Sequence, residues 1–300
     1  MNLLVTGAFA WTENELNKLR ELGHEVVFMQ QEKSPLPCEY AWVEGVIANG
    51  IFLHHPIEKF TNLKYIQLTS AGFDRVPMEY IQENGIDIFN ARGVYSIPMA
   101  EFALSSVLQL YKKSAFFYNN QKKHIWEKRR ELLELYNKNV CIIGCGSVGN
   151  ECAKRFHSFG CHVMGVDIKP YKNEFYDTML SLDEIDTALS DSDITVLTLP
   201  LTQETRHLIN SQRLMAMKSG SVLVNIARGA IVETDALIEA LNTHLGAAVL
   251  DVFEDEPLPE NSLLWDLSNV IVFPHNSFVS DGNHDRMFDV IMSNLKGITK

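Results

Sequence analysis

The amino-acid sequence predicts an α/β protein built from two doubly wound parallel sheets. Short apolar runs alternate with amphipathic stretches along nearly the whole chain, which is the pattern of strand–helix–strand units. A long apolar-faced stretch interrupts this alternation once, near residue 96. The chain has 300 residues, more than one hydrophobic core usually fills. Two domains of about 100–200 residues each are therefore expected.

The first group of elements begins with a short apolar run at residues 3–6 and an amphipathic stretch at 12–22. Further strands are predicted at 24–29, 44–48, 64–69 and 85–89. Strands that alternate with helices pair in parallel, so this part of the chain predicts one doubly wound sheet.

The second group follows a long helix that is predicted at residues 97–118, and the domain boundary is placed at its start. After this helix the alternation of strands and helices resumes. Strands are predicted at 139–143, 162–166, 193–199, 221–227, 247–252 and 269–274, and a last helix at 280–295. Because the chain ends soon after this helix, no third, regulatory domain is expected.

The charge balance argues against polyanionic partners. Lys and Arg total 26 against 38 Asp and Glu, and the resulting formal charge of −12 opposes binding to nucleic acid or to an anionic membrane. No apolar run approaches the roughly 20 residues that cross a bilayer, and the N-terminus begins as a strand rather than as a signal peptide. We expect a cytoplasmic protein without a nucleic-acid or membrane partner.

The cysteines, histidines and basic residues have structural interpretations. The five cysteines are odd in number and lack CxxC spacing, which indicates reduced thiols rather than disulfides or a zinc site. His54 and His55 have no further ligand at a metal-binding spacing, so no metal is expected. The basic cluster at residues 122–130 is interleaved with Glu127 at helical spacing and is expected to form the exposed face of a helix.

A glycine-rich turn follows the first predicted strand of the second domain. Gly144, Gly146 and Gly149 form a GxGxxG motif between this strand and a helix, with Ser147 and Val148 in the same turn. The first glycine allows the tight turn, the second lets the backbone approach a pyrophosphate, and the third lets the helix pack closely. Unpaired N–H groups at the helix start attract the diphosphate. The motif predicts a dinucleotide site.

The next predicted strand ends in a carboxylate, Asp167, which lies 18 residues after Gly149. From this position a carboxylate accepts hydrogen bonds from the adenosine ribose and repels a 2′-phosphate, which favours NAD over NADP. Lys169 leaves a role for NADP open. Cys145, inside the glycine turn, is expected to serve as a small residue rather than as a reactive thiol.

Arg228, Glu256 and His275 each lie near the carboxyl end of a predicted strand in the second domain. Ligands of open α/β sheets bind at these ends, so the three side chains are expected to converge beside the cofactor. Histidine can protonate a developing alkoxide, a carboxylate can keep it charged, and arginine can bind the carboxylate and carbonyl of a 2-oxo acid. Each residue alone also has an ordinary interpretation, as an ion pair, a turn residue or a core histidine.

Together with their flanking residues, these motifs resemble the D-isomer-specific 2-hydroxyacid dehydrogenases over about residues 64–280. The matching segments are YIQLTSAGFDRV, ARGVYSIPMAEFAL, TLPLTQETRHLIN, VLVNIARGAIVETDAL and DVFEDEPLPENSLLWDLSNVIVFPHNS. The resemblance implies an oxidoreductase that transfers a hydride between NAD(H) and a small D-2-hydroxy or 2-oxo acid. It assigns Arg228 as the catalytic arginine, Glu256 as the partner of the histidine, and His275 as the general acid-base.

The resemblance also implies a flavodoxin-like substrate domain at residues 1–95 and 276–300, and a Rossmann NAD-binding domain at 96–275. The backbone N–H groups of Ala71 and Gly72 would bind the substrate carboxylate. The neighbourhood of the nicotinamide and its ribose is assigned to Pro200, Thr205, Ala227 and Asp251. A homodimer is implied through the NAD-binding domains, with the helix at 97–118 and the segment around Trp126 as the contact.

The substrate side departs from the family pattern and leaves the acid open. Arg92 and Tyr95 stand where a proline and an asparagine are common, and residues 276–278 after the histidine also differ. Glyoxylate, hydroxypyruvate, pyruvate-like acids and 3-phosphoglycerate are all candidates. The alternative function is an NAD(H)-sensing, corepressor-like binding protein, because such relatives keep the three charged residues. Formate dehydrogenase is disfavoured by Glu256, since that enzyme pairs its histidine with glutamine.

Overall fold

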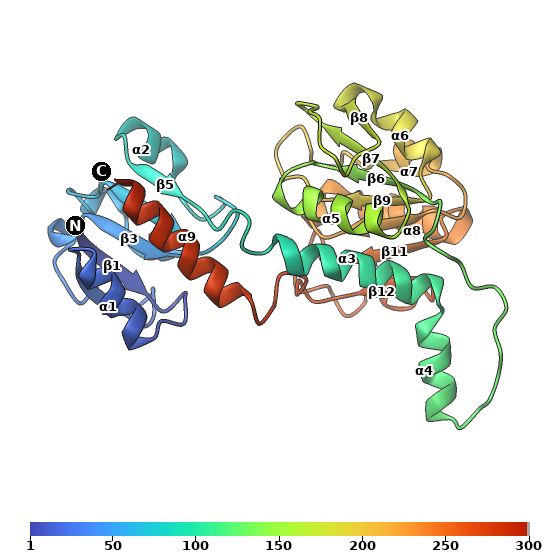
Figure 1. The fold of residues 1–300 in the computed structure, drawn as a ribbon, viewed down its shortest axis with the longest axis horizontal. Coiled ribbons are helices and arrows are strands. Elements are labelled where there is room, and N and C mark those ends of the chain that lie inside the picture. Colours follow the sequence, from blue (N-terminus) through green and yellow to red (C-terminus); the bar gives the residue numbers. More distant parts are fainter. Residues whose placement is uncertain (299–300) are drawn as a thin grey trace. The chain divides into compact units, whose positions relative to one another are not determined.

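The computed structural model describes residues 1–298 and forms two compact units (Figure 1). The first unit holds Met1–Tyr95 together with the chain from Ser280 onward, and the second holds Ser96–Val279. Each unit is built on its own parallel sheet.

The return of the chain to the first unit lies later than expected from the sequence. The expected second domain ends at residue 275, whereas the second unit extends to Val279. The physical reason is that the backbone N–H groups of Asn276 and Ser277 both donate to the buried carboxylate of Asp251. Residues 276–279 are therefore held by the second unit, which corrects the expected boundary.

The first unit contains a five-stranded sheet in which all neighbouring strands are parallel. The order β2-β1-β3-β4-β5 is the flavodoxin-like order, which confirms the expected fold class. The strands are β1 (Asn2–Thr6), β2 (Glu25–Met29), β3 (Gly45–Ala48), β4 (Tyr65–Leu68) and β5 (Asp87–Phe89). The central strands β1, β3 and β4 are largely buried on both faces, which explains their continuous apolar runs.

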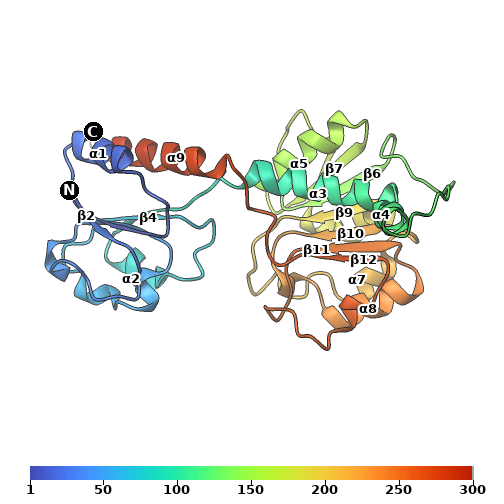
Figure 2. The ribbon, with the colours of Figure 1, turned by 90° about the horizontal axis from the view of Figure 1, so that it is seen from below.

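Helices cover both faces of this sheet (Figure 2). They are α1 (Glu13–Glu21), α2 (Met78–Glu83), α9 (Asn283–Ile298) and short 3₁₀ helices at Tyr40–Trp42, Ile51–Leu53 and Ile57–Lys59. Leu19 of α1 and Ile291 of α9 pack into one apolar cluster with Val5 of β1. Ile81 of α2 belongs to a separate cluster with Ile66 of β4, on the opposite face.

The second unit contains a seven-stranded parallel sheet in the order β12-β11-β10-β9-β6-β7-β8. Counted from its first strand, β6, this is the Rossmann order with one further strand at the edge, which confirms the expectation. The strands are β6 (Asn139–Ile143), β7 (His162–Asp167), β8 (Thr178–Ser181), β9 (Ile194–Leu197), β10 (Val222–Asn225), β11 (Ala247–Leu250) and β12 (Val270–Val272).

Helices also cover both faces of the second sheet (Figure 2). They are α3 (Ser96–Tyr111), α4 (Ser114–Lys122), α5 (Ser147–Ser158), α6 (Ile185–Asp191), α7 (Ser211–Ala216), α8 (Thr234–Thr243) and short 3₁₀ helices at Leu182–Glu184, Gly229–Ile231 and Leu263–Trp265. Side chains of α3 and α5 share one apolar cluster, whereas α6, α7 and α8 share the other. Among residues 1–298, no helix combines the length and apolar character that a membrane span needs.

The helix expected at residues 97–118 is in fact two helices, α3 and α4. Lys113 separates them in a left-handed conformation with φ of 52°, and none of the described side chains of α4 is buried. Of the basic cluster at residues 122–130, only Lys122 lies in a helix, as the last residue of α4. The cluster is therefore not the helix face expected from its spacing, because residues 125–135 have no regular secondary structure. A helix there would have no apolar surface to pack against, and packing supplies most helical stability.

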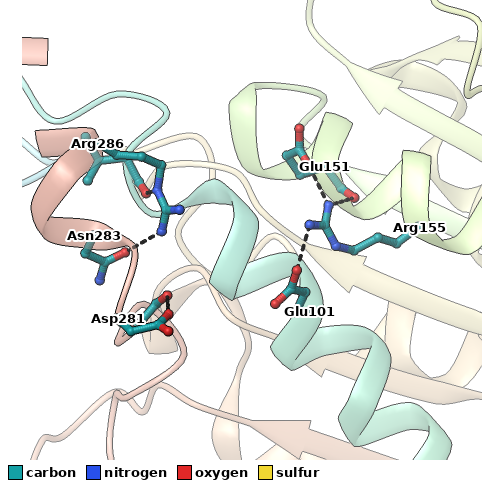
Figure 3. Close-up of polar contacts among 8 residues, drawn as sticks. Glu101, Glu151, Arg155, Asp281, Asn283 and Arg286 are labelled. Carbon is teal, nitrogen blue, oxygen red and sulfur yellow. Dashed lines mark hydrogen bonds and ion pairs between the residues drawn. The ribbon is translucent and has the colours of Figure 1, made fainter. Parts of the chain in front are cut away.

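Two arginines hold α3, the first helix of the second unit, and α9, which follows the return of the chain to the first unit (Figure 3). In the second unit, Arg155 of α5 donates to Glu101 of α3 at 3.0 Å and also pairs with Glu151. In the first unit, Arg286 of α9 donates to the Val94 carbonyl at 2.7 Å. Helix α3 is thus linked to α5 within the second unit, and α9 is linked to Val94 within the first unit.

Candidate active site

The glycine turn after β6 has the geometry of a diphosphate cradle. Gly144 has φ of 94°, and a Cβ there would lie 2.7 Å from Cα of Leu199. A Cβ on Gly149 would lie 2.2 Å from the Gly144 carbonyl oxygen. By contrast, a Cβ on Gly146 would meet no described atom within 4 Å, so this side of the turn is open.

Helix α5 begins at the open side of this turn. Its N-cap is Gly146, which provides no capping side chain, and Ser147 and Val148 form its first turn. The first N–H groups of a helix lack acceptors inside the helix and carry partial positive charge, so this end suits an anionic group. The residues present therefore fit the diphosphate of a dinucleotide.

Asp167 is the last residue of β7, and it is fixed beside the glycine turn. Its Oδ2 accepts a hydrogen bond from the Cys145 N–H at 2.8 Å, and its Oδ1 accepts one from the Lys169 N–H at 3.0 Å. Burial raises the pKa of the Cys145 thiol to about 11, so it stays protonated at neutral pH. This agrees with a small structural residue in the turn.

Arg228 follows β10 in a loop that is shaped by Asn225. The Asn225 side chain is buried; its Oδ1 accepts from the Ala227 N–H at 3.1 Å, and its Nδ2 donates to the Arg228 carbonyl at 3.0 Å. The half-buried Arg228 side chain also donates from Nη1 to the Ala227 carbonyl at 2.7 Å. Asn225 was not predicted; its signal in the sequence is a polar amide at the end of an otherwise apolar strand.

Glu256 and His275 form a hydrogen-bonded pair. Nδ1 of His275 lies 2.8 Å from Oε2 of Glu256, and Oε1 of Glu256 accepts from the Phe253 N–H at 3.0 Å. The side chains are 42% and 35% exposed, so the pair is accessible to a small molecule. With Nδ1 engaged, Nε2 is the ring nitrogen that can exchange a proton with a substrate.

The backbone of His275 is held by Asp251. His275 has φ of 53°, a left-handed conformation that costs a non-glycine residue about 1–3 kcal/mol. The Asp251 carbonyl accepts from the His275 N–H at 2.8 Å, and the fully buried Asp251 carboxylate accepts from Asn276 at 2.7 Å and from Ser277 at 3.0 Å. These three hydrogen bonds offset the free-energy cost of the left-handed backbone and fix the position of the His275 Cα, from which the imidazole extends.

The three charged residues lie at one edge of the sheet. Arg228 follows β10, Glu256 follows β11 and His275 follows β12, and these strands are neighbours in the order β12-β11-β10. Gly144 and Asp167 lie at the carboxyl ends of β6 and β7 in the same sheet. Because parallel strands end at a common edge, the dinucleotide cradle and the three charged residues share that edge.

Comparison with known proteins shows the family to which the chain belongs. The model of the D-isomer specific 2-hydroxyacid dehydrogenase, NAD binding domain, matches residues 104–277. The chain belongs to the D-isomer-specific 2-hydroxyacid dehydrogenase family. It is thus an NAD-dependent oxidoreductase of the class that acts on D-2-hydroxy acids.

Individual relatives cover most of this dehydrogenase. A glyoxylate reductase of Thermofilum pendens is 34% identical over 246 residues, which are 80% of this chain and 73% of the relative. A hydroxypyruvate reductase of Thermotoga maritima is 36% identical over 224 residues, 73% of this chain and 72% of the relative. The crystal structure of D-lactate dehydrogenase from Aquifex aeolicus, complexed with NAD and lactic acid, is 26% identical with a TM-score of 0.78, and the match covers 99% and 95% of the two chains.

The remaining residues assigned to the cofactor lie in the second unit of the dehydrogenase. Thr205 donates from its hydroxyl to the Pro200 carbonyl at 2.8 Å, so both belong to one turn after β9. Ala227 is 6% exposed, next to the arginine. Among residues 1–298, no cluster of His, Cys, Asp or Glu side chains is arranged to hold a metal ion.

The residues assigned to the substrate carboxylate lie in the first unit, after β4. The carbonyl of Ala71 accepts from Asn90 at 2.6 Å, and the carbonyl of Gly72 accepts from the Ser70 hydroxyl at 3.1 Å. The N–H groups of Ala71 and Gly72 have no acceptor within residues 1–298. In this turn the carbonyl oxygens are engaged in hydrogen bonds, whereas the two N–H groups remain available as donors. An anion-binding site has this arrangement.

Proposed function

We propose that the dehydrogenase interconverts a small 2-oxo acid and its D-2-hydroxy acid, with Arg228, Glu256 and His275 as the catalytic residues. The observation that carries this proposal is the 2.8 Å bond between His275 Nδ1 and Glu256 Oε2. It lies at the same sheet edge as Arg228 and the glycine turn. An acid, its carboxylate partner and an anion-binding arginine are the groups that reduction of a 2-oxo acid needs.

The roles follow from the chemistry of each side chain. NAD(H), when bound, supplies or accepts the hydride at C2 of the acid. In reduction, Nε2 of His275 gives its proton to the carbonyl oxygen as negative charge develops there. Glu256 stabilises the protonated imidazole through Nδ1, and Arg228 binds the carboxylate and polarises the carbonyl. The proton returns to Nε2 in the oxidation.

A small 2-oxo acid is supported by the relatives and by the first unit. Two of the relatives are named glyoxylate reductase and hydroxypyruvate reductase, and one structure contains lactic acid. All of these acids carry a carboxylate beside the reacting carbon. The N–H groups of Ala71 and Gly72, which have no acceptor within residues 1–298, are the proposed donors for such a carboxylate in the first unit.

NAD rather than NADP is supported by Asp167. Its carboxylate is fixed at the end of β7 by two backbone N–H groups. From this position it would accept hydrogen bonds from the ribose of a bound NAD and would repel a 2′-phosphate. The proposed cofactor residues are Gly144, Gly146, Ser147, Val148, Gly149, Asp167, Pro200, Thr205, Ala227 and Asp251.

The experiment is to follow NADH oxidation at about 340 nm with a panel of 2-oxo acids, and NADPH in parallel. The panel holds glyoxylate, hydroxypyruvate, pyruvate, branched and aromatic analogues, and phosphohydroxypyruvate. We expect turnover with at least one acid, a preference for NADH, and a loss of about 10²- to 10⁴-fold in kcat in His275→Asn. NADH should still bind the variant, because His275 lies outside the glycine turn. Wild-type protein that binds NADH but reduces no acid would instead favour a dinucleotide-sensing protein.

We further propose a cytoplasmic homodimer that is joined through the second unit. Helix α4 and the segment after it extend away from the sheet of this unit (Figure 1). Trp126 is 95% exposed, and the segment carries further exposed apolar side chains at Phe117, Tyr118, Ile125, Leu133 and Tyr136. Such an apolar set indicates a protein interface. All five cysteines lie among the described residues and are unpaired, which supports a reducing compartment.

A further inference from the structure

The turn that carries Glu256 contains a second glutamate, Glu254, which does not contact His275 but binds two other segments. Its Oε1 lies 2.6 Å from Nε2 of His207, and its Oε2 accepts from the Thr234 N–H at 3.0 Å and from the Thr234 hydroxyl at 2.5 Å. His207 follows β9, Thr234 begins α8, and Glu254 follows β11. One carboxylate thus joins three loops at the catalytic edge of the sheet.

We propose that Glu254 is a positioning residue that, through His207 and Thr234, sets the distance between the loop of Arg228 and the turn of Glu256. This inference rests on the proposed function, because it concerns the geometry of that catalytic site. Glu254, His207 and Thr234 are called the loop clasp below. None of the three is among the residues assigned to cofactor, substrate or proton transfer.

The first support is a close approach of two backbones. A Cβ on Gly229, the residue after Arg228, would lie 1.8 Å from the carbonyl carbon of Phe253 and 2.4 Å from the backbone nitrogen of Glu254. The arginine loop therefore lies directly against the turn that leads to Glu256. At such a contact a shift of either loop moves the other, so the relative position of the two catalytic side chains is decided here.

The second support is the path of the chain after β9. The His207 N–H donates to the Ala230 carbonyl at 2.8 Å, and the Ile209 N–H donates to the Ile231 carbonyl at 3.0 Å. The segment from His207 to Ile209 therefore runs beside the residues that follow Arg228. When the His207 side chain binds Glu254, it closes a ring of contacts around the arginine loop.

The charge on Glu254 favours these bonds. Burial would raise the pKa of this carboxyl, but the hydrogen bonds from Thr234 and His207 outweigh it, so its pKa lies below the ordinary value. The group is ionised at neutral pH and accepts from three donors, and hydrogen bonds to a charged acceptor are shorter and stronger than neutral ones. Only 26% of the Glu254 side chain is exposed, which limits competition from water.

The clasp differs from a surface ion pair in what its loss would do. A surface pair contributes little to stability and nothing to catalysis. If the clasp sets the spacing of Arg228 and Glu256, its loss should lower kcat more than it weakens NADH binding. A displacement of about 1 Å in a catalytic group can cost about 100-fold in rate.

The test uses Glu254→Gln, His207→Asn and the double variant of the full chain. Glutamine removes the negative charge and keeps the shape, and asparagine shortens the side chain while tolerating the left-handed backbone of residue 207, which has φ of 50°. The control is Asp186→Asn, which removes one charge from the Arg213–Asp186 pair between α7 and α6 of the same unit. That pair is remote in sequence from every assigned catalytic residue.

We expect kcat to fall about 10- to 100-fold in each clasp variant, with the affinity for NADH changed less than about threefold. The double variant should lose little more than either single one, because both remove the same connection. The control should keep wild-type kinetics. An unchanged kcat in Glu254→Gln, or a loss that appears only in the affinity for NADH, would overturn the inference.

A second measurement does not depend on turnover. Oxamate, an analogue of a 2-oxo acid, should quench the fluorescence of the NADH complex, and its affinity reports on the carboxylate site that includes Arg228. We expect oxamate to bind the clasp variants about 10-fold more weakly than the wild type and the control. Equal oxamate affinity in the wild type, the control and all three clasp variants would contradict the role of the clasp. Absence of turnover in the wild type would count against the proposed function but would leave this comparison readable.

Discussion

Two acidic residues hold His275 and the residues after it by different means. Asp251 is fully buried and binds the backbone of residues 275–277, whereas Glu256 is 35% exposed on its side chain and binds the imidazole. A buried charged acceptor that loses its donors costs more free energy than an exposed one, because water cannot replace them. The two residues should therefore separate stability from catalysis.

We expect Asp251→Asn to lower the free energy of unfolding by about 1–3 kcal/mol and to reduce kcat as well, because the amide turns one of the two accepting oxygens into a donor. Glu256→Gln should change the free energy of unfolding by less than about 0.5 kcal/mol and still lower kcat, because only the ring loses its charged partner. Urea denaturation and steady-state kinetics on both variants check this. Equal destabilisation by the two variants would contradict the division of roles.

The sequence predicts the positions of the proposed catalytic residues in the sheet, but not the residues that hold their loops by hydrogen bonds. Arg228, Glu256 and His275 could be placed because each follows a strand, and strand ends meet at one edge. Asn225, His207 and Glu254 were not found. Their hydrogen-bond partners come from other segments of the chain, and the local sequence pattern does not indicate which donors or acceptors these segments supply.

At the scale of elements, α1 depends on a reciprocal cap at its first turn. Oε2 of Glu15 accepts from the Thr12 N–H at 2.8 Å, and Oγ1 of Thr12 accepts from the Glu15 N–H at 3.3 Å. Oε1 of Glu15 also lies 2.7 Å from Nε2 of His284 on α9. The cap thus satisfies helix donors and ties α1 to the helix beside it.

The cap predicts a pH dependence of stability. Burial would raise the pKa of Glu15, but hydrogen bonds from Thr12 and from His284 outweigh it, so the pKa lies below its ordinary value of 4.5. A lowered carboxyl pKa means that the charged form stabilises the fold. This contribution is fully present above about pH 4.5 and is lost as the pH falls through the lowered value.

We expect Glu15→Gln to be about 1 kcal/mol less stable than the wild type at pH 6, and this difference to shrink as the pH falls below 4.5. Urea denaturation at several pH values between about 3 and 6 measures it. Glu13→Gln serves as the control, because Glu13 lies in the same turn with 75% of its side chain exposed. A difference that grows toward low pH would contradict the assigned sign.

Elements with two buried faces are the ones that the sequence predicts well. Strands such as β3, β4, β9 and β10 are buried along their whole length and appear as apolar runs. β8 is a partly exposed edge strand and has no such run. The break between α3 and α4 falls at Lys113, where neither glycine nor proline marks it. Local pattern could not separate these two helices.

At the scale of the whole molecule, the two-sheet architecture could be predicted because each sheet repeats one strand–helix unit many times. The expected crossing at residue 96 coincides with the first residue of α3. The return crossing could not be placed, because Asp251 holds Asn276 and Ser277 by bonds between distant segments. A domain boundary that is set by such long-range contacts cannot be predicted from the pattern of residues along the chain.

The proposed dimer depends on the segment between α3 and β6, which buries little of its apolar surface within the chain. Leu133 anchors it to the end of α3, since its N–H donates to the Tyr111 carbonyl at 3.1 Å and its carbonyl accepts from Lys112 Nζ at 2.7 Å. Trp126, near the far end, is 95% exposed. A segment that is anchored at its base while exposing a tryptophan is expected to bury that ring against a second copy, since aromatic anchors dominate interface energies.

We therefore expect Trp126→Ala to shift the protein from dimer to monomer at micromolar concentration, with a loss of about 2 kcal/mol or more in association free energy. Sedimentation velocity over a concentration series measures the shift. Trp265→Ala is the matched control, because this tryptophan is 52% exposed in the same unit but lies outside the segment. Dimers that survive Trp126→Ala unchanged, or that dissociate equally in Trp265→Ala, would place the interface elsewhere on the second unit.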